Sequence, residues 1–510
     1  MNALRGRLGI SAQLLGMTVA GVVALVVLVA AVVALPRSET RTAATQTSDA
    51  TSSTEETGSS PSQSTAPGGK PSQSAAGSAA TAPAGPVKVT ASSGIGAFAT
   101  KPSRFVPAKA PGITSSTVYI GIFYSSQAAS ANRALGAGGA AATYDTRDVF
   151  NATIDYANKH GGFAGRKLKA LYYDYDLTGD TNTEDQSACA FWTQDNKVFS
   201  LAARTDIGNA CAEKAGAIPY GGGAATSETF KKFPHLIAPD ETAFDRLGKV
   251  TVNGLNRAKY FSGKLGLVTW DSPQYKLTIN NGYLPSLSKI GVKPVEIAYI
   301  GEPSNLNGIS DSTAAVASAV ARFKAAGIDH VIIQDGPAGV FGDAGLTFLW
   351  MNQSKSQNYY PRYGQNAHNA PGWDVLPADQ MNNALAVDDT DLEKKFDEGW
   401  RVNKFREDCF KIQRDAGYPV SSDNINDQLA AGTSCDAVFL LQRIFNSSSR
   451  ITRDSFLRAF ERLGTSQPSA LVYGTKLFSG RRDGSNMFRN ALYLESCRCL
   501  KYQGPPAYSD

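Results

Sequence analysis

Small hydroxyl and acidic side chains follow several apolar segments of this 510-residue chain. Where parallel strands end, such groups and the N–H groups of the next helix can bind a small polar ligand. The same residue types also cap helices and form turns, so both interpretations stay open. The candidates for ligand contact on this reasoning are Ser125, Ser126, Thr205, Asp206, Thr226, Ser227 and Asp335.

Motifs for catalysis and for metal binding are missing from the same sequence. The body contains neither G-x-S-x-G nor H-E-x-x-H, and its four histidines are scattered without ligand spacing. We therefore expect no catalytic residue, no metal and no cofactor. An exported hydrolase with Cys435 as its nucleophile is the alternative, and it is disfavoured because exported thiols usually form disulfides.

Six cysteines follow the apolar N-terminal run described below and suggest disulfides. Cys189 and Cys211 fall in consecutive predicted helices, as do Cys409 and Cys435, and we favour these two pairs. Cys497 and Cys499 would share one face of a strand, where a bridge between them would be strained. Zinc is the alternative for this C-x-C, and it is disfavoured by the scattered histidines, so the pairing stays open.

The elements that must position these residues alternate between β-type and helical segments. VYIGIFY (118–124) is followed by a helical pattern over 146–162 and by LKALYYDYD (168–176), and the alternation resumes from KLGLVTW (264–270). This order predicts an α/β fold of two doubly wound parallel-sheet lobes with several hinge crossovers. We expect crossings near Ile237–Pro239 and Tyr363–Asn369. Lobe 1 would comprise residues 114–238 and about 366–470, and lobe 2 would comprise 239–365 and about 471–510.

The N-terminus predicts where the chain resides. Arg5 and Arg7 precede an apolar, uncharged run from Leu14 to Leu35, and about 20 such residues cross a bilayer core as a helix. We expect residues 1–13 in the cytoplasm, a transmembrane helix over 14–35 and the body on the extracytoplasmic side of the cell membrane. A cleaved secretory signal is the alternative, and it would export the body as well.

Residues 36–113 are dominated by Ser, Thr, Ala, Gly and Pro, which predicts a disordered linker between membrane and body. The net charge of the whole chain is +5, without a basic block in the body. The sequence therefore predicts a membrane partner for the N-terminal helix and no nucleic-acid partner.

The order of the segments resembles the type I periplasmic binding proteins, in particular the branched-chain amino-acid (Leu/Ile/Val) receptors of ABC importers. The resemblance runs through nearly all of residues 114–503. NATIDYANKHGGFAGRKLKALYYDYD is its most specific part, and KLGLVTWDSPQY and CDAVFLLQRIF with ITRDSFLRAFERLG extend it. The Cys189–Cys211 spacing also resembles a disulfide found in lobe 1 of some members.

This resemblance implies roles for matching positions. Ser125 and Ser126 would line the cleft, and Thr205 would offer a hydroxyl to a ligand carboxylate, although Arg204 and Asp206 replace small residues beside it. Asp335 would contact the ammonium. The remaining matches are Thr226 and Ser227 in the loop for the amino-acid head group and Tyr275 as the aromatic residue of lobe 2.

The resemblance thus implies a membrane-tethered solute-binding protein that holds an amino-acid-like small molecule between two lobes. Its partner would be an ABC permease. The alternatives are a sensor that passes the closed state to a membrane partner, or a scaffolding ectodomain of the same fold without a transport role.

Overall fold

A computed structural model describes residues 94–98, 110–134, 142–221, 223–338, 341–392, 403–422, 424–448 and 450–509. The chain divides into compact units Met1–Ala82 and Pro83–Asp510, and every described residue belongs to the second. The predicted membrane helix and most of the predicted linker lie outside the described residues. Within those residues, no helix combines the length and the apolar character needed to cross a bilayer.

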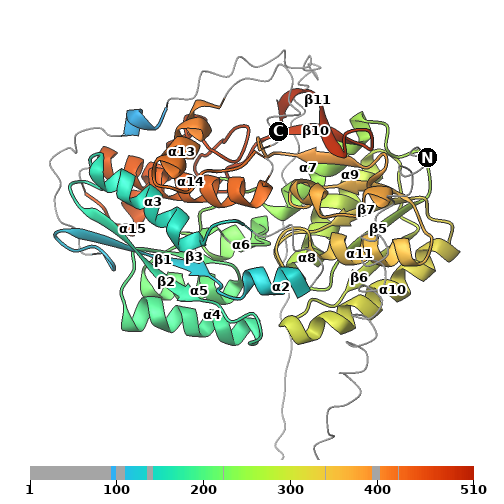
Figure 1. Cartoon of the computed structure of the whole chain (residues 1–510), viewed down its shortest axis with the longest axis horizontal. Coiled ribbons are helices and arrows are strands. Elements are labelled where there is room, and N and C mark those ends of the chain that lie inside the picture. The colour runs from blue at the N-terminus through green and yellow to red at the C-terminus, as the bar shows by residue number, and fades with distance from the viewer. Residues whose placement is uncertain are drawn as a thin grey trace, which may run out of the picture. The chain divides into compact units, whose positions relative to one another are not determined.

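The described strands form two sheets, and we call each sheet with its helices a lobe. The sheet of the first lobe has four parallel strands in the order β2-β1-β3-β4. Its strands are β1 (Thr117–Tyr124), β2 (Lys167–Asp174), β3 (Ser200–Ala203) and β4 (Ile218–Gly221). In Figure 1 this sheet lies on the left.

Helices cover both faces of the first sheet. α3, α13 and α14 lie on one face and α4 and α5 on the other (Figure 1). Successive side chains of β1 point to opposite faces of the sheet. Val118 and Ile120 belong to the core under α3 and α14, whereas Tyr119 packs on the side of α4 and α5. The helical segments of this lobe are η1 (Ile95–Phe98), α2 (Ala128–Ala134), α3 (Thr146–Lys159), α4 (Thr181–Ala190), η3 (Phe191–Asp195), α5 (Asp206–Ala215), α6 (Ser227–Lys232), α13 (Lys404–Asp415), α14 (Ile425–Ser447) and α15 (Arg453–Glu461).

The sheet of the second lobe has seven described strands in the order β11-β10-β9-β8-β7-β5-β6. The five strands from β6 to β9 are parallel, and β10 and β11 extend the sheet as an antiparallel hairpin. The strands are β5 (Leu265–Trp270), β6 (Glu296–Ile300), β7 (His330–Gln334), β8 (Arg362–Gln365), β9 (Leu385–Asp388), β10 (Met487–Leu494) and β11 (Cys499–Tyr508).

Two apolar cores lie on the two faces of this second sheet. One joins the sheet to α10 and α11, and the other joins it to α7, η4 and α9. The helical segments are α7 (Phe244–Arg257), α8 (Pro273–Thr278), η4 (Ile279–Tyr283), α9 (Leu284–Lys289), η5 (Leu306–Gly308), α10 (Ile309–Ala325), α11 (Gly345–Ser356), η6 (Ala370–Asp374) and α12 (Ala378–Met381). The predicted α/β fold with parallel sheets is confirmed.

The return of the chain to the first lobe lies later than the sequence predicted. Tyr363–Asn369 was expected to cross between lobes, but β8 and β9 both pair within the second sheet, so the crossing follows Asp388. β9 is a buried, four-residue strand with no strong pattern of its own, which is why it was assigned to lobe 1. The other lobe boundaries stay predictions.

Three stretches of chain connect the lobes and lie beside one another. They run between β4 and α7, between β9 and α13, and between α15 and β10. Ala238 pairs with Asp483, and Thr390 pairs with Val472, as isolated bridges between these stretches. We call the three stretches the hinge.

The six cysteines, all within the described residues, form three disulfides. Cys189–Cys211 joins α4 to α5 and Cys409–Cys435 joins α13 to α14, as expected. Cys497 and Cys499 are also bonded to each other. The two do not share a strand, because Cys497 lies in the turn of the β10–β11 hairpin and Cys499 begins β11, and the turn brings their side chains together.

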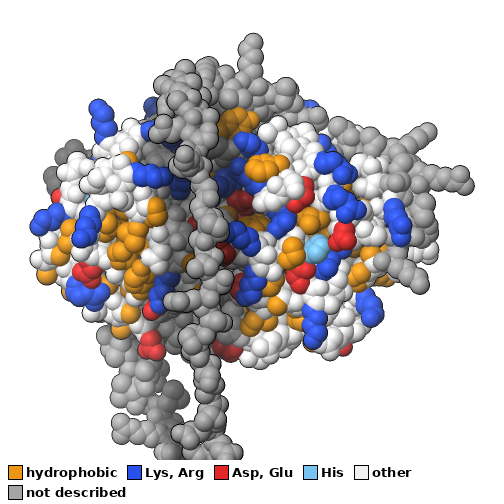
Figure 2. Space-filling view, turned by 180° about the vertical axis from the view of Figure 1, so that it is seen from behind, with side chains coloured by type: hydrophobic (Ala, Val, Ile, Leu, Met, Phe, Trp, Pro, Cys, Tyr) orange, Lys and Arg blue, Asp and Glu red, His pale blue; other side chains and the backbone are white. Residues whose placement is uncertain are grey.

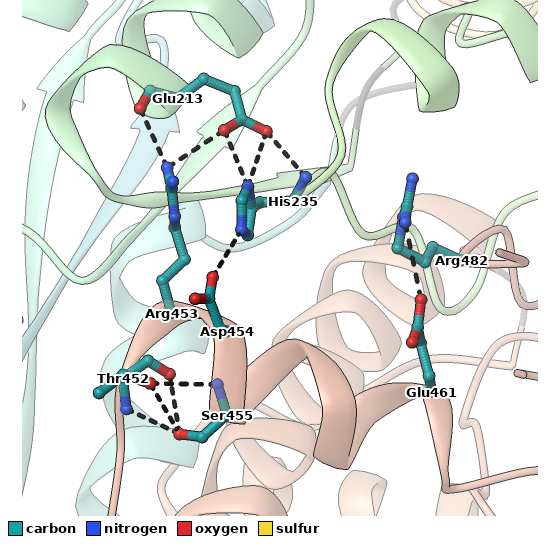
Figure 3. Close-up of polar contacts among 8 residues, drawn as sticks. All are labelled: Glu213, His235, Thr452, Arg453, Asp454, Ser455, Glu461 and Arg482. Carbon is teal, nitrogen blue, oxygen red and sulfur yellow. Dashed lines mark hydrogen bonds and ion pairs between the residues drawn. The ribbon is translucent and has the colours of Figure 1, made fainter. Parts of the chain in front are cut away.

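A polar cluster fixes α15 against α5 in the first lobe (Figure 3). His235 contacts Glu213 through Nδ1 at 2.9 Å and Asp454 through Nε2 at 3.1 Å, and Arg453 contacts Glu213 at 3.1 Å. Because α15 follows the crossing into the second lobe and the crossing back from it, this cluster joins parts of the first lobe that are distant in sequence. On the face seen in Figure 2, Lys and Arg side chains lie between acidic and apolar ones.

Candidate functional site

A cavity of about 560 Å³ lies between the two lobes. It is bounded by the carboxyl ends of β3 and β4 in the first lobe, by the loops after β7 and β8 in the second, and by the hinge. Parallel sheets usually bind ligands at this end, and pockets for small molecules measure about 300–1,000 Å³. We call it the interlobe cavity.

Four carboxylates line the interlobe cavity among the described residues. Asp240 and Glu241 come from the first hinge crossing and Asp389 from the second, while Asp343 follows β7. The two hinge crossings are adjacent, so acidic residues about 150 positions apart in the sequence share one wall.

Burial in this wall raises the pKa of three of these carboxyl groups. The pKa of Asp240 is raised to about 6 by burial. Burial, and then the charge of Asp240, raise the pKa of Glu241 to about 8. Burial, and then the charge of Asp388, raise the pKa of Asp389 to about 7. The cavity wall is therefore a place where negative charge is poorly solvated.

His368 supplies a positive charge that acts on Glu241 and Asp389. Burial alone would lower its pKa, but the hydrogen bond to Asp343 at 2.9 Å and the charges of Glu241 and Asp389 raise that pKa to about 9. Its ring also packs at a tilt on Phe244, with centroids 4.8 Å apart. His368 is consequently an imidazolium at neutral pH.

The remaining wall of the interlobe cavity is largely apolar. Aliphatic and aromatic side chains from α7, α11, α14 and the hinge face it, which suits the carbon skeleton of a ligand. These side chains belong to Leu247, Phe341, Phe348, Val375, Ile425, Leu429, Leu471 and Val472.

A smaller cavity of about 70 Å³ lies at the ends of β3 and β5. Arg204 lines both cavities, and Thr205, Asp206 and Tyr275 line the small one. The structure thus brings three of the predicted contacts together. Asp206 also forms an ion pair with Lys232 at 2.6 Å.

Thr205 has two structural roles at this small cavity. As the N-cap of α5, its side chain accepts a hydrogen bond from the backbone N–H of Gly208, and its hydroxyl donates to Asp185. Asp185 is 2% exposed, and burial raises the pKa of its carboxyl group. Thr205 therefore pairs with one oxygen of a buried acid that sequence reasoning did not single out, while the other oxygen has no hydrogen-bond partner in the described structure.

The serines and threonines of two other predicted loops do not line either cavity. Ser125 accepts a hydrogen bond from the backbone N–H of Gln127, and Ser126, which is exposed, donates its own N–H to Asp174 at 2.9 Å. Thr226 is the buried N-cap of α6, and the backbone N–H of Ser227 donates to Asp245. Their contact with ligand stays a prediction that this arrangement does not support.

Asp335 is an internal support and not a cavity residue. It is fully buried, and its carboxylate accepts hydrogen bonds from the N–H and the hydroxyl of Thr347 and from the Trp270 indole at 3.2 Å. These donors occupy both oxygens, so this arrangement does not support the expected contact with a ligand ammonium, which stays a prediction. Tyr275 also donates its hydroxyl inward, to the carbonyl of Pro337.

Sequence reasoning missed the acids that do line the interlobe cavity. Asp240 and Glu241 follow Pro239 in LIAPDETAF, and Asp389 lies in the run DDTD. The acidic pair next to the expected crossing at Ile237–Pro239 was a usable signal, but β9 had to be recognised before Asp389 could be placed in the hinge.

On the side away from the hinge, the lobes touch directly. Thr181 at the start of α4 donates its backbone N–H and its hydroxyl to the carbonyl of Ser304, at 3.0 and 2.7 Å. The backbone N–H of Leu306 donates to Leu177 at 3.1 Å. We call these contacts the latch, and they hold the lobes together across the mouth of the cleft.

Solved structures share the fold of the described body. A branched-chain amino-acid ABC transporter protein from Thermus thermophilus with bound valine matches at 14% identity and a TM-score of 0.55, over 78% of this chain and 97% of that chain. A solute-binding protein from R. palustris in complex with 4-hydroxybenzoate matches at 11% identity and a TM-score of 0.55, over 77% of this chain and 97% of that chain. A fatty acid ABC transporter substrate-binding protein from Thermomonospora curvata matches at 14% identity and a TM-score of 0.53, over 79% and 95%.

No model of a known protein family matches the sequence, and no curated protein matches it significantly. The structural matches establish the fold: the body has the fold of ABC-transporter substrate-binding proteins. This agrees with the resemblance to type I periplasmic binding proteins drawn from the sequence.

Proposed function

We propose that this protein is a solute-binding protein that closes two lobes on a small molecule in the interlobe cavity. The observation that carries the proposal is the cavity itself, which is lined by both lobes and by the hinge and is opposite the latch. Ligand contacts from both lobes favour the closed state, because a ligand shifts the equilibrium by its difference in affinity for the two states.

The wider setting of the proposal follows the N-terminal sequence and the structural neighbours. Residues 14–35 anchor the chain in the cell membrane, the body lies on the extracytoplasmic side, and an ABC permease receives the ligand. The proposal includes no catalytic step, because the cavity contains side chains for binding and none of the catalytic motifs sought in the sequence.

The test is a search for small molecules that co-purify with the full-length chain in detergent. The protein is denatured, the released molecules are identified by mass spectrometry, and each is added back to ligand-free protein. We expect one of them to raise the midpoint of thermal unfolding in proportion to the logarithm of its concentration above Kd. A well-folded chain that releases nothing, and that no solute stabilises at millimolar concentration, would contradict the proposal.

A further inference from the structure

The acids of the interlobe cavity outnumber its cationic side chains among the described residues. Asp240, Glu241, Asp343 and Asp389 face Arg204 and His368. His368 is bonded to Asp343, and the Arg204 guanidinium lies over the ring of Tyr175, 5.2 Å from its centroid, on the side of the small cavity. Three carboxylates therefore remain without a cation of the chain bonded to them in the described structure.

Several oxygen atoms in this wall also have no hydrogen-bond partner. No ion pair joins the side chain of Asp240 or Glu241 to a described cationic residue, and the hydrogen bond given for the Asp240 carboxylate is to its own backbone N–H. Asp389 is 6% exposed, and one of its oxygens accepts from the Ser485 hydroxyl at 2.6 Å, while the other has no partner in the described chain.

A fourth polar group lies beside these acids. The Tyr220 hydroxyl at the end of β4 is buried, lacks a hydrogen-bond partner among the described residues, and belongs to a cavity-lining residue. Burial, and then the charges of Asp240, Asp436 and Glu241, raise its pKa, so the hydroxyl lies near those carboxylates. A buried polar group left unpaired is costly, and the Tyr220 hydroxyl lies near acids that come from the hinge.

These acceptors call for a ligand that donates hydrogen bonds and carries positive charge. Protonated amines and guanidines have only donors at their charged end. A bare metal ion fits less well, because no three acidic, histidine or cysteine side chains of the described chain are grouped closely enough to hold one. The apolar wall and the volume of about 560 Å³ suit a carbon skeleton.

We propose that the interlobe cavity binds an organic cation, a protonated amine or guanidine. Its charged end lies among Asp240, Glu241 and Asp389, and its carbon skeleton packs on Phe341 and Phe348. The inference rests on the proposed function and deepens it by naming the class of ligand. Valine, 4-hydroxybenzoate and fatty acids, which the structural neighbours are named for or contain, all carry a carboxyl group, so this chain would differ from them.

The test is isothermal titration of the full-length chain in detergent at pH 8 and about 150 mM salt. The probes are putrescine, agmatine and phenethylamine, with hexanoate and 4-hydroxybenzoate as carboxylate counterparts, valine as a zwitterion that carries both charged groups, and Ca²⁺ as the metal alone. We expect at least one organic cation to bind, and its affinity to fall about tenfold or more in Glu241→Gln and further in Asp240→Asn/Glu241→Gln.

Asp311→Asn is the matched control, because Asp311 is an exposed carboxylate on α10 outside the cavity. It should bind the same cation with unchanged affinity, and thermal unfolding of every variant establishes that it is folded. Binding of the carboxylates alone, tight binding of Ca²⁺ that excludes the amines, or unchanged affinity in Glu241→Gln would each overturn the inference and leave the proposed function standing. If no probe binds and no ligand co-purifies with the chain, both the inference and the proposed function are contradicted.

Discussion

Thr205 stabilises the edge of the cleft through two bonds of a single hydroxyl group. It caps α5 and donates to one oxygen of the buried Asp185 carboxylate, so the end of β3 and the start of α5 depend on it. A helix cap and a hydrogen bond to a buried acid each stabilise by about 1 kcal/mol. The side chain that the sequence suggested for ligand contact thus has a full set of internal partners.

We predict that Thr205→Ala lowers the free energy of unfolding by about 1–2 kcal/mol. Thr205→Ser retains the hydroxyl and should stay within about 0.5 kcal/mol of the parent, since surface changes without a named loss have effects of that size. Chemical denaturation monitored by tryptophan fluorescence measures both. Unchanged stability in Thr205→Ala, with ligand binding lost, would mean that the hydroxyl contacts ligand instead.

The cavity acids predict how stability depends on pH. A carboxyl group with a higher pKa in the folded chain than in the unfolded chain holds its proton longer when folded, so stability falls as pH rises through that interval. The interval runs from the ordinary value of about 4 up to about 6 for Asp240, 7 for Asp389 and 8 for Glu241. The pKa of His368 is raised to about 9, so the stability that this imidazolium contributes to the folded chain is also lost as the pH rises to that value.

The titratable and charged side chains in and around the wall of the interlobe cavity are Arg204, Tyr220, Asp240, Glu241, Arg246, Asp343, His368, Asp388, Asp389 and Asp436. We predict that the unfolding midpoint of the ligand-free chain falls steadily from pH 5 to pH 9. Glu241→Gln should flatten the decline near pH 8, because it removes a carboxyl group whose pKa is raised to about 8. Calorimetric scans from pH 5 to pH 9 measure the unfolding midpoint of both proteins. An identical fall of the midpoint with pH in the parent and in Glu241→Gln would contradict the raised pKa of Glu241.

At the scale of elements, the latch joins α4 of the first lobe to the loop after β6 of the second. Thr181 makes both of its bonds to one carbonyl group, that of Ser304. Because these bonds join the two lobes, we expect them to favour the closed state and to contribute to ligand affinity without touching the ligand.

We predict that Thr181→Val weakens ligand binding roughly two- to tenfold, mainly through faster release, because it removes one hydrogen bond worth about 0.5–1.5 kcal/mol. Thr313→Val is the control, since the Thr313 hydroxyl donates within α10 to Ile309 and does not reach the other lobe. Stopped-flow release rates measure the effect. Equal rates in Thr181→Val and the parent would show that the latch does not contribute to closure.

Gly484 allows the hinge crossings to pack against each other. Its N–H donates to the carbonyl of Ala238 at 2.7 Å, and a Cβ at this position would collide with the carbonyl oxygen of Pro239. Pro239 directly precedes Asp240, so displacing it would also move the cavity acids.

We predict that Gly484→Ala destabilises the chain by about 1–3 kcal/mol, as overpacking does elsewhere, and weakens ligand binding as well. Gly96→Ala is the control, because a Cβ there meets nothing within 4 Å. Denaturation and titration of both variants test this. A Gly484→Ala protein with parental stability would show that the crossings have room to separate.

At the scale of the whole molecule, alternation of apolar strands and helices was enough to predict the two parallel sheets and two of the three disulfides. This prediction failed for a short strand whose sequence has no clear alternation of apolar and polar residues. β9 has four buried residues, so the hinge crossing after it was placed too early. The Cys497–Cys499 bond depends on a hairpin turn that periodicity does not reveal.

The candidate site was harder to predict because its residues come together only through the hinge. Thr205, Asp206 and Tyr275 follow their own strands and were found at the small cavity. Glu241 and Asp389 lie in different crossings, and their proximity depends on how the whole chain passes between the lobes. Asp335 followed a strand as required, but it is turned inward by Trp270 and Thr347.

The most direct test of the account is a crystal structure of the full chain with 4-iodophenethylamine, whose iodine can be located by anomalous scattering. We predict closed lobes, with the iodine in the interlobe cavity near Phe341 and Phe348 and the ammonium within hydrogen-bond distance of Glu241. Iodine bound only outside this cavity, while the lobes are closed and the chain is folded, would contradict the account.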